Sequence, residues 1–356
     1  RASGGTGTVN IQNTNASGNI AYTTGVLRIA TGCRATLTNV NFTAKANEVL
    51  GTDNVPLLMT TTSTTGFTRI YNSTFYRNGN NTNTESTTAI LSLGNNTLIS
   101  NVTFGSTKGA ADFAIQAATT AALGNITVTQ SRFNDYLRIK LTGAAGTNIR
   151  MFDNSSGTNK GNYYTAIGNY NVTDGNADGF GDGGSEYPLS TSTAPWVFSG
   201  STATFNDSGP IKTASDPVGC GDLNRAGQTY TMTANAASIV MFSAENCVSF
   251  NKNNTVLDCA GYSLTESSNK LGYLIGVGST WNTTVKNCVL SGTRRGISGD
   301  NLGNNLTITN VNQSASTNGI INTQSNGTIQ NSNISVSGST ITLSTNNQLM
   351  QNGYAN

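Results

Sequence analysis

The segment from Asp174 to Asp182 carries the most chemically specific pattern in this chain of 356 residues. Five candidate ligands lie at alternate positions, and they are Asp174, Asn176, Asp178, Phe180 through its carbonyl group, and Asp182. Gly179 stands at the sixth position, where a calcium loop makes its sharp turn. Alternate oxygen donors around such a turn suit a hard cation. The spacing therefore predicts that calcium binds this loop.

The end of the loop departs from the full calcium-binding pattern. Glu186 is the thirteenth residue rather than the twelfth, so a bidentate closure by its carboxylate is not expected. The flanking residues show no helical pattern either. The alternative interpretation is a surface turn, rich in Asp and Gly, that binds no metal.

A repeated strand unit must position this loop, because relatives of one short pattern recur along the chain. The pattern is an apolar or β-branched strand, then an amide residue, then an aromatic or aliphatic residue three positions later. The amide positions, with one aspartate among them, are Asn39, Asn72, Asn101, Gln130, Asp258, Asn287, Asn310 and Asn331. Their spacing within each series, roughly 21 to 33 residues, is typical of solenoid repeats. We therefore predict an all-β fold, a right-handed parallel β-helix.

Stacked turns of a β-helix lie about 4.8 Å apart, so side chains at equivalent positions meet. We expect the amide residues to hydrogen-bond along the axis as an inward-facing ladder. The aromatic residues should stack inside the helix, and they are Phe42, Phe75, Phe104 and Phe133. The alternative is that the pattern is a coincidence in a chain rich in Asn.

Four of the five cysteines lie between residues 220 and 356. Cys259 and Cys288 follow the equivalent positions of consecutive repeats, so their Cα atoms should lie about 5 Å apart, within disulfide range. Cys220 and Cys247 are then left to form a second bridge. The alternative is a stack of buried, reduced cysteines. Cys33 is the odd residue, and it either is buried or bonds another subunit.

Composition excludes several classes of function. The chain has no histidine, which removes the commonest general base and the commonest transition-metal ligand. Glycoside hydrolysis needs two opposed carboxylates, and the acids outside the 174–182 loop form no pair at adjacent positions of neighbouring repeats. We therefore predict that the protein is not an enzyme. A net charge of +2 indicates no nucleic-acid partner, and no apolar stretch is long enough for a membrane span.

Two stretches resemble NosD-type surface proteins, which are built from PbH1 β-helix repeats and are common in archaea. The first stretch, residues 161–189, reads GNYY, DGNADGFGD and EYPL in that order. The second begins at Cys220 and reads CGDLNRAGQTYTMTANA, NNTVLDCAGYSL and TVKNCVLSG. The resemblance implies a parallel β-helix exported to the cell surface, but no single activity. Copper handling does not carry over, because this chain has no histidine.

The pattern divides the chain into two β-helix blocks, residues 1–189 and 220–356. The first block ends in the Asp- and Gly-rich loop. Residues 190–219 carry Pro195, Pro210 and Pro217 among Ser, Thr and Gly, which is typical of a linker or of accessory strands outside the solenoid.

We expect an extracellular, cell-surface structural protein: a subunit of a filament, sheath or surface layer that assembles with copies of itself. A chain that starts at Arg1 without methionine is either processed or trimmed, and processing would fit an exported protein. Asn-x-Ser/Thr sequons predict glycosylation, for example at Asn41, Asn125 and Asn282. Sequons at Asn72 and Asn101 should be inaccessible if the ladder faces inward.

The ends of the chain suggest how copies would join. No amphipathic capping helix is evident at either end, so open strands at both ends could pair with another copy. The alternative is that flexible termini cover them. A function from another class, a carbohydrate-binding adhesin or a polysaccharide-degrading enzyme, would use the aromatic residues Tyr163, Tyr164, Trp196 and Trp281 to stack on sugars.

Overall fold

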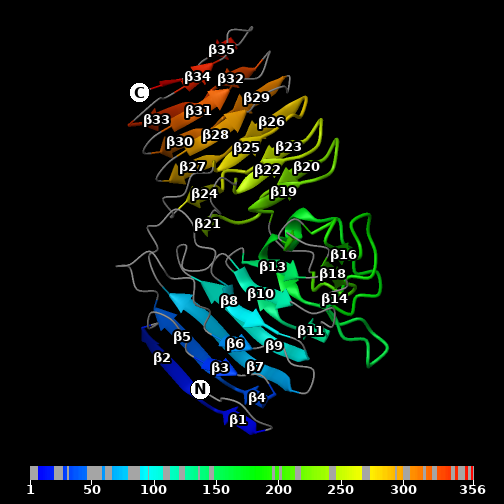
Figure 1. Ribbon diagram of the computed structural model, residues 1–356. Coiled ribbons are helices and arrows are strands. Elements are labelled where there is room, and N and C mark those ends of the chain that lie inside the picture. The colour runs from blue at the N-terminus through cyan, green and yellow to red at the C-terminus, as the bar shows by residue number, and fades with distance from the viewer. Residues whose placement is uncertain are drawn as a thin grey trace. The chain divides into compact units, whose positions relative to one another are not determined.

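The computed structural model describes the strands and corners of the solenoid and parts of its connecting loops. The described residues are 7–19, 27–29, 32–45, 58–60, 66–78, 89–94, 96–106, 113–119, 125–134, 137–143, 148–194, 197–199, 203–212, 218–239, 246–266, 273–292, 295–299, 305–315, 318–322, 327–337, 341–343, 349–351 and 354–355. Their pairing confirms the predicted fold class, an all-β parallel solenoid (Figure 1). Helical structure in this part of the chain is one 3-10 helix, Thr165–Asn169, which falls far short of a membrane span.

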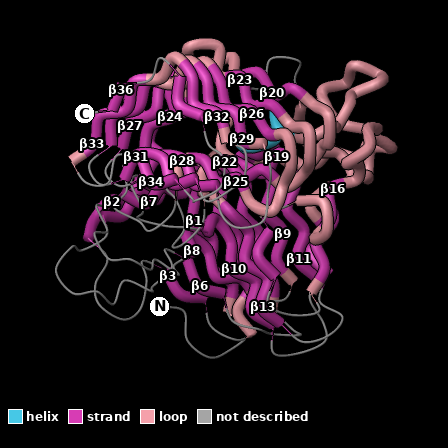
Figure 2. Tube along the Cα trace, turned by 90° about the horizontal axis from the view of Figure 1, so that it is seen from above, coloured by secondary structure: helices cyan, strands magenta, loops and turns pink. Residues whose placement is uncertain are grey.

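The chain divides into two compact units. Unit 1 consists of Arg1–Ile167 and Asn171–Ala214, and unit 2 consists of Gly168–Tyr170 and Ser215–Asn356. In each unit, successive strands along the chain fall into three rows of parallel neighbours (Figure 2). Two rows of unit 1 join in one 12-stranded sheet, and every other row is a separate six-stranded sheet.

Unit 1 contains rows 1a, 1b and 1c. Row 1a runs through β1 (Thr8–Gln12), β4 (Arg34–Thr38), β7 (Phe67–Asn78), β9 (Thr97–Ser106), β11 (Asn125–Thr129), β14 (Asn148–Arg150) and β18 (Thr204–Asp207). Row 1b runs through β2 (Asn15–Asn19), β5 (Asn41–Lys45), the second halves of β7 and β9, β12 (Arg132–Phe133) and β15 (Tyr163–Tyr164). Row 1c runs through β3 (Leu27–Ile29), β6 (Leu58–Thr60), β8 (Ala89–Leu93), β10 (Phe113–Thr119), β13 (Arg138–Gly143) and β17 (Val197–Ser199).

Unit 2 contains rows 2a, 2b and 2c. Row 2a runs through β19 (Gly221–Leu223), β22 (Val248–Phe250), β25 (Ile275–Val277), β28 (Arg295–Gly299), β31 (Asn318–Asn322) and β34 (Ile341–Leu343). Row 2b runs through β20 (Thr229–Thr231), β23 (Val256–Asp258), β26 (Thr283–Lys286), β29 (Leu306–Thr309), β32 (Thr328–Gln330) and β35 (Leu349–Gln351). Row 2c runs through β21 (Ala236–Ile239), β24 (Ser263–Glu266), β27 (Val289–Gly292), β30 (Asn312–Ala315), β33 (Asn333–Val336) and β36 (Tyr354–Ala355).

An aromatic column fills the interior of unit 1. Ring centroids along it lie 5.5, 6.2, 5.1, 5.2 and 6.3 Å apart, in the order Phe42, Phe75, Phe104, Phe133, Tyr164 and Phe205. The first five residues are register partners in row 1b, so each ring packs on its counterpart in the next turn. Tyr164 and Phe205 extend the column beyond the four phenylalanines that the repeat pattern indicates.

The prediction that residues 190–219 lie outside the solenoid is wrong for the strands they contain. β17 pairs with β13, and β18 pairs with β14, both in parallel register. Phe205 on β18 therefore occupies the next position in the core. Its burial stabilises a strand in a segment that is otherwise rich in turn-forming residues. The edge of β18 is covered by β16 (Leu189–Ser190), which runs antiparallel to it.

Candidate functional site

Most of the predicted ladder residues occupy a sharp corner between two rows. Seven of them have a left-handed backbone with φ between 47° and 57°, and they are Asn39, Asn72, Asn101, Gln130, Asn287, Asn310 and Asn331. Asn adopts this conformation more readily than most residues, because its short side chain tolerates positive φ. The amide residues of the repeat pattern therefore mark the corner itself.

Amide hydrogen bonds connect neighbouring corners, but the ladder does not face inward as predicted. Asn39 Nδ2 donates to Asn13 Oδ1 over 3.1 Å, and Asn101 Nδ2 donates to Asn72 Oδ1 over 2.9 Å. These side chains are exposed, because a left-handed corner turns the residue outward while the flanking strand residues point in. Asn13, which the repeat pattern did not include, has the same backbone, with φ of 51°.

The ladder of unit 2 starts at a carboxylate. Asn287 Nδ2 donates to Asp258 Oδ1 over 3.0 Å, and Asn310 Nδ2 donates to Asn287 Oδ1 over 3.1 Å. The other oxygen of Asp258 forms an ion pair with Lys286 Nζ at 3.1 Å. Burial tends to raise the pKa of Asp258, but hydrogen bonds from Asn287 and the Ala260 N–H, together with Lys286, leave that pKa below its ordinary value.

A second exposed ladder precedes row 2b. Asn282 Nδ2 donates to Asn254 Oδ1 over 3.0 Å, and Asn305 Nδ2 donates to Asn282 Oδ1 over 2.8 Å. All three residues have positive φ, as do the residues of the first ladder. An Asn directly before each strand was the available sequence signal.

These contacts bear on the three sequons singled out above. Asn282 is exposed, but its amide nitrogen already donates to Asn254. Asn41 is exposed on β5, and the side chain of Asn125 lies outside the described residues. Glycosylation at each site stays a prediction.

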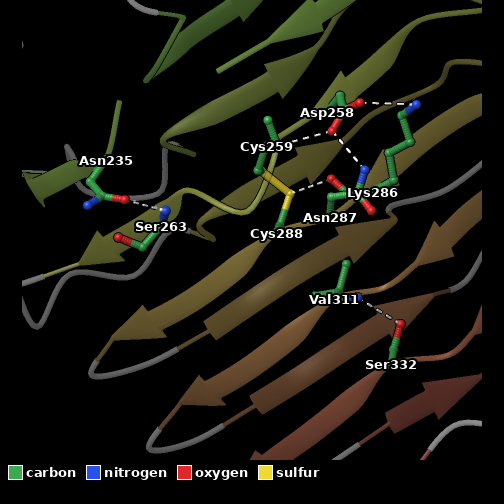
Figure 3. Close-up of a disulfide and its surroundings, with 10 residues drawn as sticks. Asn235, Asp258, Cys259, Ser263, Lys286, Asn287, Cys288, Val311 and Ser332 are labelled. Atoms are coloured by element: carbon green, nitrogen blue, oxygen red, sulfur yellow. Dashed lines mark hydrogen bonds and ion pairs between the residues drawn. A yellow bond between two sulfur atoms is a disulfide. The ribbon is translucent and has the colours of Figure 1, made fainter. Parts of the chain in front are cut away.

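Both predicted disulfides form in unit 2. Cys259 and Cys288 join with a Cα–Cα distance of 4.8 Å, and Cys220 and Cys247 join with a Cα–Cα distance of 4.5 Å. Figure 3 shows the first bridge beside the Asp258 interactions. Cys33 is buried and belongs to no disulfide among the described residues, which fits the first of its two alternatives.

The position that follows the corner residue links successive turns in both units. In unit 1, Val40 N donates to the buried Ser73 Oγ over 3.2 Å, and Val102 N donates to Ser131 Oγ over 3.1 Å. In unit 2 the same position holds Cys259 and Cys288, then Val311 and Ser332, whose N–H···Oγ bond is 3.2 Å (Figure 3). The disulfide thus replaces one valine–serine pair.

In the candidate calcium loop, the carboxylates accept hydrogen bonds from backbone N–H groups of the loop itself. Asp174 accepts hydrogen bonds from the N–H groups of Asp178 and Gly179, at 3.2 and 2.7 Å. Asp178 Oδ1 accepts from Phe180 N at 2.9 Å, and Asp182 Oδ1 accepts from Gly175 N at 2.8 Å. Gly179 makes the turn with φ of 90°.

The donor set fits calcium in part. Each carboxylate oxygen keeps acceptor capacity beyond one N–H bond, and oxygen ligands suit this cation. Glu186, however, accepts a hydrogen bond from Asn171 N, away from the 174–182 turn. Within the described ranges, no three Asp, Glu, His or Cys side chains are gathered as a metal-binding group.

A buried polar cluster, which the repeat pattern did not indicate, lies at the end of the aromatic column. Asp207 Oδ2 accepts hydrogen bonds from Tyr164 Oη at 2.8 Å and from Asn162 N at 3.1 Å, and its Oδ1 accepts from Gly209 N at 3.1 Å. A Cβ at Gly161 would lie 1.9 Å from Oδ1, so only glycine fits there. Asp207 itself is fully buried.

Burial dominates the titration of this carboxyl. It raises the pKa of Asp207, and the hydrogen bonds from Gly209, Tyr164 and Asn162 offset only part of that rise, so that the pKa is about 7. The cluster joins residues 45 positions apart, Asn162 and Asp207, so no local motif indicated it. The aromatic–x–Asp pattern of residues 205–207 was its one weak signal.

The aromatic residues considered for sugar stacking separate into three environments. Tyr164 is 2% exposed and lies within the aromatic column. The guanidinium group of Arg132 stacks on the ring of Tyr163, 4.2 Å from the ring centroid. Trp281 is 54% exposed, whereas Trp196 lies outside the described residues.

No family model matches the chain, and neither a curated protein nor a solved structure matches it. The resemblance to NosD-type proteins therefore depends on the quoted motifs, and the parallel solenoid is compatible with it.

Proposed function

We propose that the protein is an extracellular structural subunit of a filament, sheath or surface layer, and that copies join through open strand edges of its two units. The observation that carries the proposal is that the first strands of unit 1 (β1, β2 and β3) and the last strands of unit 2 (β34, β35 and β36) have one described neighbour each. Such an edge presents N–H and C=O groups that template another strand.

The register of β1 identifies the atoms that would make the joint. Gly7 O accepts from Arg34 N, and Asn13 N donates to Thr38 O, so odd-numbered residues face β4. Backbone groups alternate along a parallel pair. The N–H and C=O groups of Thr8, Asn10 and Gln12 therefore point to the open edge.

Other features support an extracellular structural role. Disulfides persist in oxidising compartments, and unit 2 has two of them across its first turns. The exposed amide ladders add side-chain bonds between turns without charge. Calcium at the 174–182 loop is part of the proposal, because a cation would neutralise Asp174, Asp178 and Asp182 in one turn.

The test uses two matched variants of the β1 edge. Asn10→Pro removes one N–H from the open edge, whereas Asn10→Ala keeps it and trims the same exposed side chain. In electron micrographs, the parent and Asn10→Ala should form polymers, and Asn10→Pro should remain monomeric with unchanged circular dichroism. Polymers of Asn10→Pro equal to those of the parent would show that β1 is not the joint.

One exposed residue favours a second candidate function, glycan binding. Trp281 presents a large apolar ring to solvent, as sugar-stacking residues do. A glycan array probed with the monomeric Asn10→Pro variant tests this function. Binding that Trp281→Ala abolishes would support an adhesin over a structural subunit.

A further inference from the structure

The near-neutral total charge conceals a strong segregation along the chain. Residues 1–150 carry eleven Lys or Arg and five Asp or Glu, whereas residues 151–189 carry one Lys and five acids. The described strands of residues 7–150 contain nine of the basic residues and no acidic residue. Unit 1 therefore has a basic strand region and an acidic loop.

Two guanidinium groups in the basic region flank one aromatic ring. The Arg69 guanidinium lies 4.7 Å from the centroid of the Phe67 ring, and that of Arg34, on the neighbouring strand β4, lies 5.7 Å from it. Both arginines are exposed. We call Arg34, Phe67 and Arg69 the arginine cluster of row 1a.

The Phe67 ring positions these guanidinium groups but leaves their N–H donors without an acceptor. A stacked guanidinium keeps its in-plane N–H donors for a carboxylate, which it can bind in bidentate geometry. Among the described residues, neither guanidinium has a hydrogen-bond or ion-pair partner, and both lie against the Phe67 ring. The cluster is a preformed site for anionic oxygen groups.

The acidic loop is a matching ligand. Asp178 and Asp182 are exposed, and each accepts a backbone hydrogen bond that fixes its orientation. The loop is anchored at its base, where Phe180 and Ile211 form a bridge and Gly181 N donates to Pro210 O. In Figure 1 the green loops beside β16 and β18 project from the strands of unit 1.

We propose that the arginine cluster of row 1a binds the acidic 174–182 loop of a second copy, so that neighbouring solenoids associate side by side with a stagger. The loop is anchored beside β18, four strands along row 1a from β7. At about 4.8 Å per strand the stagger is about 19 Å. The same separation keeps the loop of one copy away from its own cluster.

This inference rests on the proposed function and adds a lateral contact to it. Calcium and the arginine cluster would use the same carboxylates of the loop, so the two compete and the lateral contact forms with the calcium-free loop. The two are separable, because Asn10→Pro blocks end-to-end pairing and leaves both charged regions intact. Sedimentation velocity of Asn10→Pro in EDTA, which keeps cations off the loop, then measures lateral association alone.

Charge reversal in that background identifies the contact. Arg69→Glu and Asp178→Arg should each weaken association at least about tenfold, because like charges then meet. A mixture of the two variants should associate as heterodimers. Lys252→Glu is the matched control, since it makes the same charge change as Arg69→Glu at an exposed site in unit 2. Association of the parent should also fall in 0.5 M salt.

Several outcomes would overturn the lateral contact. If the Arg69→Glu variant associates as strongly as its parent, the arginine cluster is not part of the contact. If the two charge-reversed variants are folded but their mixture fails to associate, the cluster does not pair with the loop. Loss of binding to a polyuronate column by Arg69→Glu, with self-association unchanged, would assign the cluster to an acidic glycan instead. If polymers of the parent form but do not bundle, the end-to-end proposal survives and this one does not.

Discussion

In unit 1 the interior beside the corner is a column of six aromatic rings, whereas in unit 2 the corresponding column of row 2c holds Leu264, Leu290, Gln313 and Ile334. Unit 2 instead has two disulfides across its first turns. Aromatic rings bury more area and add stacking energy, and a disulfide restricts the unfolded chain. The same backbone repeat therefore tolerates two different sources of stability.

The two units can be followed separately, which lets experiments test this difference. Unit 1 contains Trp196 and unit 2 contains Trp281, and the chain has no other tryptophan. Trp281→Phe and Trp196→Phe leave one fluorescent reporter in each unit. Denaturation of these two backgrounds measures the stability of each unit.

The largest effect should come from the aromatic column. Phe104→Ala removes a fully buried ring that packs on Phe75 and Phe133, and we expect a loss of about 3–5 kcal/mol in unit 1. Leu290→Ala is the counterpart in unit 2 and should cost about 2–5 kcal/mol there. If Phe104→Ala lowers the stability of unit 2 as much as that of unit 1, the two columns are not independent.

The pH dependence of the two units should have opposite signs. Asp207 has a pKa of about 7 in folded unit 1 and 3.8 when unfolded. The folded state therefore binds the proton more tightly, and the stability of unit 1 should fall by up to about 4 kcal/mol as pH rises from 4 to 7. Asp258 has a lowered pKa, so its contribution to unit 2 is lost as pH falls below about 4.

Fluorescence unfolding from pH 3 to 8 measures both slopes. Asp207→Asn should flatten the slope of unit 1 between pH 4 and 7, whereas Asp258→Asn should leave it unchanged. A unit 1 whose stability is constant over this range would show that Asp207 does not titrate there.

The disulfide can be exchanged for the pair that unit 1 uses at the same position. The double variant Cys259→Val with Cys288→Ser should fold, because Val40 with Ser73 and Val311 with Ser332 already pack this way. Loss of the 29-residue covalent loop should cost unit 2 about 3 kcal/mol. Reductant should destabilise the parent and have a smaller effect on the variant.

The reverse exchange in unit 1 is the control. Val102→Cys with Ser131→Cys has the same separation of 29 residues and should form a disulfide that raises unit 1 stability. Free thiols in that variant, measured after denaturation under oxidising conditions, would show that the two corners are not equivalent.

The smallest effect should be that of calcium, and it should be confined to unit 1. At a hundredfold excess over its dissociation constant, calcium should stabilise unit 1 by about 2.7 kcal/mol. Chelator or Asp178→Ala should remove this increment and leave unit 2 unchanged. An identical melting curve with calcium and with chelator would mean that the loop is a metal-free turn.

The sequence predicted the features that recur with the period of the turn. Phe42 to Phe133, Cys259 with Cys288, and the corner amides repeat because each turn presents one position to its neighbour. The direction of the ladder could have been predicted too. Asn, unlike Phe, is suited to positive φ, and a left-handed corner residue points away from the core.

The features that the sequence did not indicate depend on contacts outside the repeat. Residues 151–196 interrupt the regular spacing of the sequence repeat. The pattern therefore did not predict that the chain returns to row 1c at β17 and to row 1a at β18. Asp207 is buried because Asn162 and Gly209 supply donors across that interruption. Such a site follows from three-dimensional packing rather than from local pattern.

The valine–serine pairs have a consequence for how this chain could grow or shrink by duplication. Val40 with Ser73, Val102 with Ser131, and Val311 with Ser332 each join two consecutive turns. The donor in each bond is a backbone N–H, which every residue except proline carries, so the serine is the required member of the pair. An inserted turn should therefore be tolerated best where it brings a serine to this position, because the N–H of the preceding turn then keeps its acceptor.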